Sequence, residues 1–268
     1  MRLPLSSALA LAPFLCSLGC TAVLGIEDTT LATEDAGPPP AGQDYGCVGK
    51  APPTPSEATI TITVSVTDLN KKPLEGITVK VCTRFDTQCL AAESFQTGKD
   101  GSVAIPQPTG ASGFDGSLEI AGEESPGKPF LPVRWFFPNP LVADLALPVL
   151  MIGEDIFKAI APGQVTFDPA AGQLTLAIAD CQGQPSSGVT YAVSGLGDKS
   201  VETYSKSSAF VVKDAESATD KSGQAIVFNV PPGNVTVTTT NQAKEQVASF
   251  GLTIQAGKIS TVILQPNL

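Results

Sequence analysis

The sequence contains no histidine, and this absence removes much of conventional enzyme chemistry. Histidine is the usual general base near neutral pH, the commonest zinc ligand and the partner of serine or cysteine in nucleophilic catalysis. Catalysis would have to depend on carboxylates, lysine or tyrosine. We therefore expect a protein that is not an enzyme and that has no cofactor and no metal site.

Charge is also scarce, and most of it is negative. Only 16% of the residues are charged, and the formal net charge is −10. Because an acidic surface repels phosphate backbones, we expect no nucleic-acid partner. Turn-forming residues, by contrast, are abundant, with 25 Gly and 23 Pro in 268 residues. This composition indicates a β-rich fold of many short elements, and the length leaves room for two domains of ordinary size.

The one long apolar stretch lies at the N-terminus. Residues 1–19 carry a positive charge at Arg2 and then an apolar run that is too short, and too interrupted by proline, to remain as a membrane helix. We predict a secretory signal peptide over 1–19. Its end, Ser17-Leu18-Gly19-Cys20, resembles the lipobox of bacterial lipoproteins, although Ser17 stands where that pattern usually has Leu.

The lipobox resemblance implies that Cys20 is acylated and becomes the new N-terminus. Thr21, in place of Asp, then implies attachment to the outer membrane, on its periplasmic or its cell-surface side. The alternative is an ordinary secretory signal followed by an unrelated cysteine. Residues 20–56 contain a proline run and an acidic cluster, and we predict that they form a disordered tether. A flexible coil of about 26 residues, from the anchor to Cys47, would span roughly 28 Å.

A spaced triplet of turn residues occurs twice in the remaining chain. The two copies lie 112 residues apart and consist of Asp68, Pro73 and Gly76, and of Asp180, Pro185 and Gly188. Each triplet separates two stretches in which apolar and polar residues alternate, which is the period of a β-strand with one buried face. The repeat therefore predicts two β-sandwich domains, over 57–150 and 164–268, each closing its own hydrophobic interior.

The alternation also gives the expected elements. The strands of the first half are 59–66, 77–81, 102–105, 116–120, 132–137 and 143–147, and those of the second half are 174–178, 191–193, 226–230, 235–240, 247–254 and 259–264. The polar loop 195–208 is the one gap in the second half that demands another element. Ile152, Ile156 and Ile160 recur at helical spacing, which predicts a short helix within the linking segment 151–163.

The order of strands and turns resembles that of the carboxypeptidase regulatory-like domains, which share a transthyretin-like β-sandwich. The residues that carry the resemblance are Asp68, Pro73, Gly76, Thr97, Asp100 and Gly101 in the first half, and Asp180, Pro185, Gly188, Thr219, Gly223, Pro232 and Gly233 in the second. Ser222 replaces the usual Asp before Gly223. The resemblance implies an all-β protein of two tandem Ig-like or transthyretin-like sandwiches. These motifs are turn chemistry, so they specify the fold far better than the function.

Four cysteines remain once the signal peptide and Cys20 are set aside. They are Cys47, Cys82, Cys89 and Cys181, and in an oxidising compartment they are expected to form disulfides. Three pairings exist. A bridge between Cys82 and Cys89 closes a short loop at little entropic cost and leaves Cys47 to pair with Cys181. A zinc site built from the four thiolates is the alternative, but no C-x2-C pair is present.

Two further groups of residues have a functional interpretation and a structural one. Five loop-end acids, Asp68, Asp86, Asp100, Asp115 and Asp144, could together bind calcium, or each could accept hydrogen bonds from its own turn. Trp135, Phe136 and Phe137 are candidate partner-binding residues, because clustered aromatic side chains stack on sugars or anchor protein partners. The alternative is that they pack against the linking helix or between the domains.

These observations favour a non-enzymatic, lipid-anchored cell-envelope protein that acts as a structural spacer or as a binding or adhesion module. Its partners would be the membrane, through the N-terminal lipid, and a glycan or an envelope protein. A second hypothesis is a carrier of a small ligand or metal ion in the periplasm or at the cell surface. A third is a hydrolase with an acid-only site, although no recognisable catalytic acid motif is present.

Overall fold

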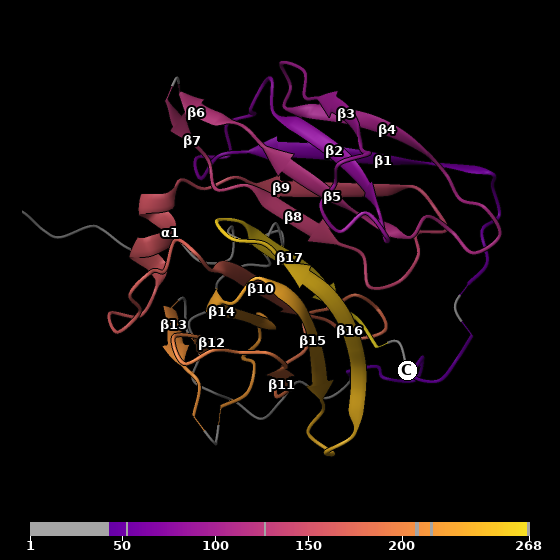
Figure 1. Cartoon of the computed structure of the whole chain (residues 1–268). Helices are drawn as coiled ribbons and strands as arrows, with labels where there is room; N and C mark the ends of the chain where they lie inside the picture. The colour runs from indigo at the N-terminus through magenta and orange to yellow at the C-terminus, as the bar shows by residue number, and fades with distance from the viewer. Residues whose placement is uncertain (1–42, 52, 126, 207–208, 215–216, 267–268) are drawn as a thin grey trace, which may run out of the picture.

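The computed structural model describes residues 43–51, 53–125, 127–206, 209–214 and 217–266 (Figure 1). The signal peptide, Cys20 and the part of the tether up to residue 42 lie outside the described residues. Apart from one short helix, the regular elements are β-strands arranged in packed sheets. The prediction of an all-β sandwich architecture is therefore confirmed.

The first half is a sandwich of seven strands. One sheet has the order β4-β1-β9, and it packs against four strands in the order β3-β2-β5-β8. The bounds are β1 Thr59–Thr67, β2 Thr78–Thr83, β3 Glu93–Gln96, β4 Ser102–Pro108, β5 Gly116–Ala121, β8 Val133–Phe136 and β9 Leu145–Leu150. In the sequence, a small hairpin of β6 (Glu123–Ser125) and β7 (Lys128–Pro129) lies between β5 and β8. The alternating residues of β1 are buried, as the period of two predicted.

The second half repeats this plan. Its first strand, β10, pairs antiparallel with β14 and parallel with β17, as β1 does with β4 and β9. The opposing sheet has the order β11-β15-β16. The bounds are β10 Gly172–Ile178, β11 Thr190–Val193, β12 Val201–Lys206, β13 Ala209–Val212, β14 Gln224–Val230, β15 Gly233–Thr240, β16 Gln246–Ile254 and β17 Ile259–Leu264.

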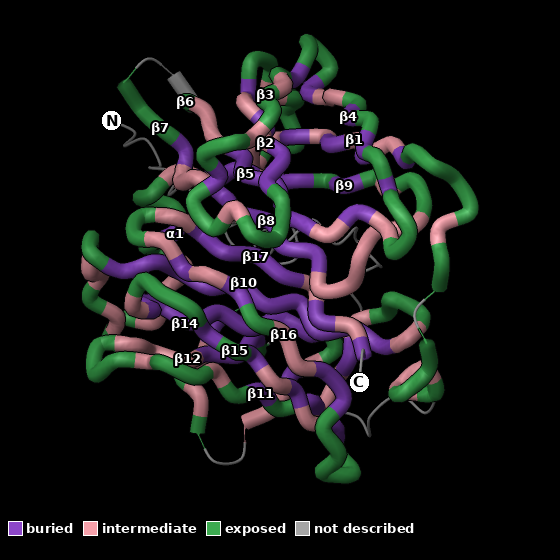
Figure 2. Tube along the Cα trace, turned by 45° about the vertical axis from the view of Figure 1, so that its right-hand side comes forward, coloured by how far each residue is buried: buried purple, intermediate pink, exposed green. Residues whose placement is uncertain are grey.

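The two halves are joined edge to edge into one sheet. β17 pairs in parallel with β8, from Ile259 opposite Val133 to Val262 opposite Phe136. The result is a nine-stranded sheet with the order β13-β12-β14-β10-β17-β8-β5-β2-β3, whose central strands are buried (Figure 2). The prediction that each half closes its own interior is wrong, because one apolar cluster contains residues of both halves, such as Trp135 and Phe228. The boundaries 57–150 and 164–268 stay a prediction.

The duplicated turn has the same hydrogen bonds in both copies. The Asp68 carboxylate accepts the amide N–H groups two and four residues later, at 2.8 and 2.9 Å. The Asp180 carboxylate does the same, at 2.9 and 2.9 Å. Thr97 Oγ1 donates to a backbone carbonyl in the turn at 2.6 Å, and Thr219 Oγ1 does so at 2.7 Å. Each aspartate thus satisfies the amides of its own turn, as expected for this residue.

The structure differs from the expected elements in the helix and in five strands that were not predicted, β3, β6, β7, β12 and β13. The helix α1 spans Glu154–Ile160, and the side chain it buries is Phe157, whereas Ile156 is 40% exposed. Because the helix begins only after Gly153, Ile152 lies outside it and the predicted isoleucine face does not form. Within the polar segment 195–208, residues 201–206 form β12. Its polar side chains are tolerated inside because they find partners, as when Thr203 Oγ1 donates to the Ile226 carbonyl at 2.7 Å.

Candidate functional site

The aromatic residues singled out in the sequence lie inside the protein. Trp135, Phe136 and Phe137 are 5%, 8% and 5% exposed. Their strand β8 is the one that joins the halves, so Trp135 packs into the shared cluster on one face while Phe136 packs into the second cluster on the other, near Phe250. These buried side chains are therefore not available to a partner; Trp135 and Phe136 pack where the halves join, whereas the Phe137 ring lies edge to face against Phe114 of the first half.

Both favoured disulfides are present. Cys47 pairs with Cys181 and Cys82 with Cys89, at Cα–Cα distances of 5.8 and 5.1 Å. The first bridge fixes the described part of the tether to the second half. There Asp44 adds two backbone hydrogen bonds, from its N–H to the Asp180 carboxylate at 3.2 Å and from the Cys181 N–H to its own carbonyl at 2.8 Å.

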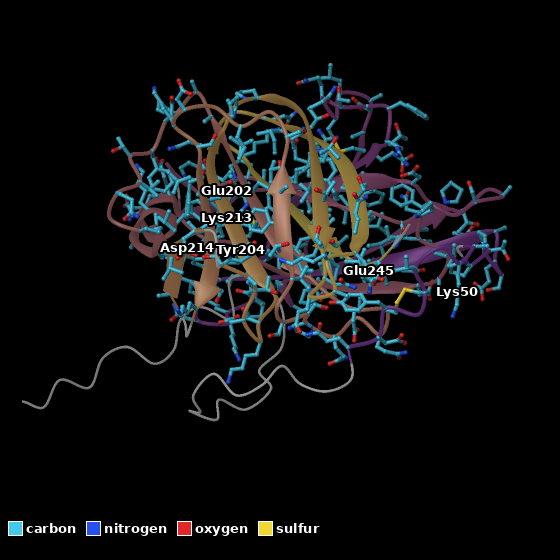
Figure 3. The ribbon with its side chains drawn as sticks, turned by 90° about the horizontal axis from the view of Figure 1, so that it is seen from below. Lys50, Glu202, Tyr204, Lys213, Asp214 and Glu245 are labelled. Carbon is cyan, nitrogen blue, oxygen red and sulfur yellow. A yellow bond between two sulfur atoms is a disulfide. The ribbon has the colours of Figure 1, made fainter. Side chains whose placement is uncertain are left out.

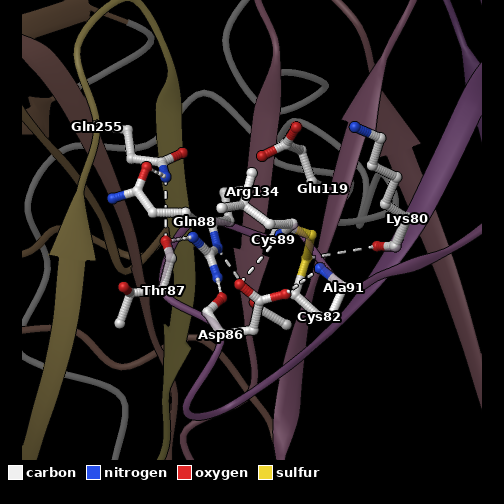
Figure 4. Close-up of a disulfide and its surroundings, with 12 residues drawn as sticks. Lys80, Cys82, Asp86, Thr87, Gln88, Cys89, Ala91, Glu119, Arg134 and Gln255 are labelled. Carbon is white, nitrogen blue, oxygen red and sulfur yellow. Dashed lines mark hydrogen bonds between the residues drawn. A yellow bond between two sulfur atoms is a disulfide. The ribbon is translucent and has the colours of Figure 1, made fainter.

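The second bridge closes a loop between Cys82 and Cys89, and we call the segment Thr83–Leu90, which ends one residue after the bridge, the disulfide loop (Figure 4). It folds over the outer face of β5 and β8, where Arg134 is only 2% exposed. The Arg134 guanidinium donates to the carbonyls of Thr87 and Asp86, the latter at 3.0 Å, and to Ser117 Oγ at 3.1 Å. Burial lowers the pKa of this guanidinium, so a desolvated cation supports the backbone of the loop from below.

Other contacts hold the same loop. The Asp86 carboxylate accepts the Leu90 and Ala91 N–H groups at 3.0 and 2.9 Å, and these bonds lower the pKa of Asp86. Gln255 Nε2, from the turn before β17, donates to the Thr87 carbonyl at 3.0 Å. Lys258 of that turn also forms an ion pair of 2.5 Å with Glu119 on β5. The disulfide loop is therefore tied to both halves of the nine-stranded sheet.

Two large apolar side chains of this loop project into solvent. Phe85 is 94% exposed and Leu90 is 86% exposed, more than any other large apolar side chain in the described part of the chain. Sequence reasoning missed them. The available signal was that Phe85 lies within, and Leu90 directly after, the six residues between Cys82 and Cys89, a span too short to fold back and bury them.

A second surface feature is an open hollow in the second half, with a volume of about 420 Å³. Its walls are the segments 164–169 and 198–201, and Asn229 holds them together. The Asn229 Nδ2 donates to the carbonyls of Thr166 and Lys199 at 2.8 and 3.2 Å, and its Oδ1 accepts the Asp168 N–H at 2.9 Å. At the rim, Lys199 Nζ lies 2.8 Å from the Asp168 carboxylate and lowers its pKa. The volume is in the range of small-ligand sites.

A third feature is a cluster of polar side chains in the second half that includes Glu202, Tyr204 and Lys213 (Figure 3). Lys213 Nζ lies 2.7 Å from a Glu202 carboxylate oxygen, donates to the Tyr191 carbonyl at 2.8 Å and sits 4.6 Å from the centre of the Tyr191 ring. Tyr191 and Tyr204 are buried ring against ring, with centroids 4.8 Å apart. Burial raises the pKa of Tyr204 to about 12. These groups are mutually satisfied, which indicates a structural role.

The five loop-end acids are engaged separately. Asp68, Asp86, Asp100 and Asp144 accept backbone N–H groups, and Asp115 pairs with an arginine at 2.8 Å. Among the residues that the structure describes, no three metal-binding side chains come together. In the same part of the chain, no helix is both long and apolar enough to cross a bilayer.

Comparisons with known proteins give only distant similarities. No family model and no curated protein matches the chain. The shaft pilin SpaA of Lactobacillus rhamnosus GG aligns over 78% of this chain and 98% of its own, with 10% identity and a TM-score of 0.26. A streptococcal ancillary pilin aligns over 79% and 63%, with 12% identity and a TM-score of 0.26. The major pilin subunit BcpA of Bacillus cereus aligns over 78% and 99%, with 9% identity and a TM-score of 0.25. The β-sandwich assignment therefore rests on the sheets of this chain itself.

Proposed function

We propose that the chain is a non-enzymatic, lipid-anchored cell-envelope protein that acts as a structural spacer and as a binding module. The observation that supports the spacer role best is the continuous nine-stranded sheet. At 4.7–4.9 Å between neighbouring strands, its eight intervals extend for about 38 Å. Because the joint between the halves is made of backbone hydrogen bonds and shared apolar packing, the two sandwiches hold a fixed relative position.

The anchoring part of the proposal rests on the sequence. Acylated Cys20 would hold the chain at the outer membrane, and the tether would let the body stand away from the bilayer. The disulfides support export, since such bridges persist in oxidising compartments. Metabolic labelling with palmitate tests the anchor. Label on the wild type that is lost in Cys20→Ala is expected, and label that persists in Cys20→Ala would refute acylation at this residue.

The hollow beside Asp168 favours a second candidate function, that of a small-ligand carrier. Its polar rim and its apolar wall at Phe167 resemble the composition of ligand pockets. A glycan array probed with the labelled protein tests this idea. Thr166 lines the hollow and is exposed, so Thr166→Trp should fill it without disturbing the interior. Capture that Thr166→Trp abolishes would support a carrier, and capture that Thr166→Trp leaves unchanged would exclude this hollow.

A further inference from the structure

The disulfide loop combines a fixed backbone with exposed apolar side chains. A bridge to Cys89, a buried arginine, the Asp86 carboxylate and Gln255 all constrain it. Burying the Arg134 cation is unfavourable unless it is fully paired, and here its donors are used to hold loop carbonyls. The loop therefore keeps one conformation, and in that conformation Phe85 and Leu90 contact almost nothing.

We propose that this loop inserts Phe85 and Leu90 into the interface of a lipid bilayer and so fixes the orientation of the body on the membrane. The inference rests on the proposed lipid anchor. The charge around the loop supports a lipid partner. Arg84 is ion-paired with Asp115 at 2.8 Å, the Asp86 carboxylate is occupied by amides, and the other polar residues of the loop are uncharged. Because the loop carries one positive and one negative residue, it can approach a bilayer that contains anionic lipid with less like-charge repulsion than the rest of a protein of net charge −10.

The strength of the contact suits an anchored protein. Burying two side chains of this size corresponds to a dissociation constant on the order of millimolar, which is too weak to recruit the chain from solution. A short flexible tether supplies an effective concentration that is also on the order of millimolar. The anchor would therefore provide the attachment, and the loop would select which face of the body meets the membrane.

A second copy of the chain is a poorer occupant. Stable protein–protein interfaces bury about 800 Å² on each partner, whereas a Phe and a Leu on one loop offer only a fraction of that area, since even a whole aromatic side chain buries about 150–250 Å². A bilayer needs no matching pocket, and its apolar interior accepts two side chains as readily as many.

Fluorescence quenching in vesicles tests the insertion. The acylated mature protein would be reconstituted in phosphatidylcholine vesicles that contain brominated phosphatidylcholine. Phe85→Trp places a reporter in the loop, and the wild-type protein, whose single Trp135 is buried, gives the background. Ala243→Trp, at the exposed β15–β16 turn of the second half, is the matched control. We expect quenching of about half of the fluorescence from the reporter in the loop, because the dissociation constant of the contact and the effective concentration given by the tether are comparable. We expect little quenching at position 243.

Further variants separate the outcomes. Adding Leu90→Ser to Phe85→Trp should weaken insertion about tenfold or more and bring quenching down to the control level. Because both side chains are exposed, the melting temperature should stay at the wild-type value, which excludes misfolding. Equal quenching at positions 85 and 243, in protein that floats with the vesicles, would overturn the insertion while leaving the anchor intact. Failure to float with the vesicles would overturn the anchor and this inference together.

Discussion

Replacing Gly101 with alanine should destabilise the protein much more than replacing Gly76. Both glycines have a left-handed backbone, with φ of 73° and 76°. A Cβ added at Gly76 would have no heavy atom within 4 Å, so Gly76→Ala carries only the conformational cost of about 1–2 kcal/mol. A Cβ added at Gly101 would lie 2.6 Å from the Val66 carbonyl oxygen and 3.0 Å from the Leu74 amide nitrogen. Displacing this backbone adds about 1–3 kcal/mol of overpacking.

The second copy of the turn gives an internal replicate. At Gly223, where φ is 65°, a Cβ would lie 2.4 Å from the Ile178 carbonyl oxygen. In each copy the clash would also disturb a ladder bond of 2.8 Å, from the Val66 N–H to the Gly101 carbonyl and from the Ile178 N–H to the Gly223 carbonyl. Gly101→Ala and Gly223→Ala should therefore each lower the free energy of unfolding by about 2–5 kcal/mol.

Urea denaturation of the three variants measures these differences, since the midpoint at constant slope reports the change in stability. The reasoning would be refuted if Gly101→Ala were no more destabilising than Gly76→Ala, to within about 0.5 kcal/mol. Such a result would mean that the turn does not pack against β1 as described. The two copies would not be structurally equivalent if Gly101→Ala caused a large loss of free energy of unfolding while Gly223→Ala caused no larger a loss than Gly76→Ala.

Three further predictions concern the joint, the tyrosines and the disulfides. Trp135→Ala should cost about 3–5 kcal/mol and should speed hydrogen exchange in both halves, because Trp135 belongs to the shared cluster; faster exchange in the first half alone would contradict the shared interior. Burial raises the pKa of both Tyr191 and Tyr204, the latter to about 12, whereas an unfolded tyrosine titrates near 10. The stabilisation from keeping these tyrosines neutral in the folded state is therefore complete below pH 10, and above it the free energy of unfolding should fall by about 1.4 kcal/mol per pH unit for each tyrosine. Urea midpoints that stay constant through this range would contradict the raised pKa values of the two tyrosines. Cys47→Ser opens a bridge between residues 134 positions apart, and Cys82→Ser opens one between residues 7 positions apart. The free energy of unfolding should therefore fall by about 5 kcal/mol in Cys47→Ser and by about 2.4 kcal/mol in Cys82→Ser. A larger fall in Cys82→Ser would contradict the loop-closure argument.

Local chemistry was predictable from the sequence. The turn residues Asp68 and Gly101 act through bonds to atoms within about thirty-five residues of themselves, and their counterparts in the second half through bonds to atoms within about forty-five residues. The short Cys82–Cys89 bridge followed from the same locality, and it left the other pair by elimination. Even the departure at Ser222 is understandable, because Ser222 Oγ accepts the Gln224 N–H at 3.3 Å, the role that the Asp100 carboxylate has for Ser102 at 3.0 Å.

The joint between the halves was not predictable from the same patterns. Residues 133–136 pair with residues 259–262, which are more than one hundred positions away in the sequence. The alternating apolar pattern of a strand is the same whether its edge is open or paired, so the pattern did not indicate this pairing. The aromatic cluster was misleading for this reason. Without knowledge of the joint, Trp135 looks like a surface residue of the first domain. The exposed Phe85 and Leu90 were missed for a different reason: the apolar pattern by itself does not show whether a side chain is covered, and the one signal of their exposure was the shortness of the loop between Cys82 and Cys89.

The two copies differ at the edge where the sheet could continue. β9 is the counterpart of β17, yet it ends the sheet β4-β1-β9 whereas β17 pairs onward with β8. Successive residues of a parallel strand direct their N–H groups to opposite neighbours. The Met151 N–H donates to the Thr67 carbonyl of β1, so the backbone N–H positions of the even-numbered residues of β9, Pro148 among them, point away from β1 toward the open edge. Proline has no N–H to donate, and such residues blunt sheet edges against further pairing. In β17 the outward position that corresponds to Pro148 is Ile263, which keeps its donor. The same strand plan therefore gives a joined edge in one copy and a blunted edge in the other, which allows two sandwiches to fuse while opposing the addition of a third.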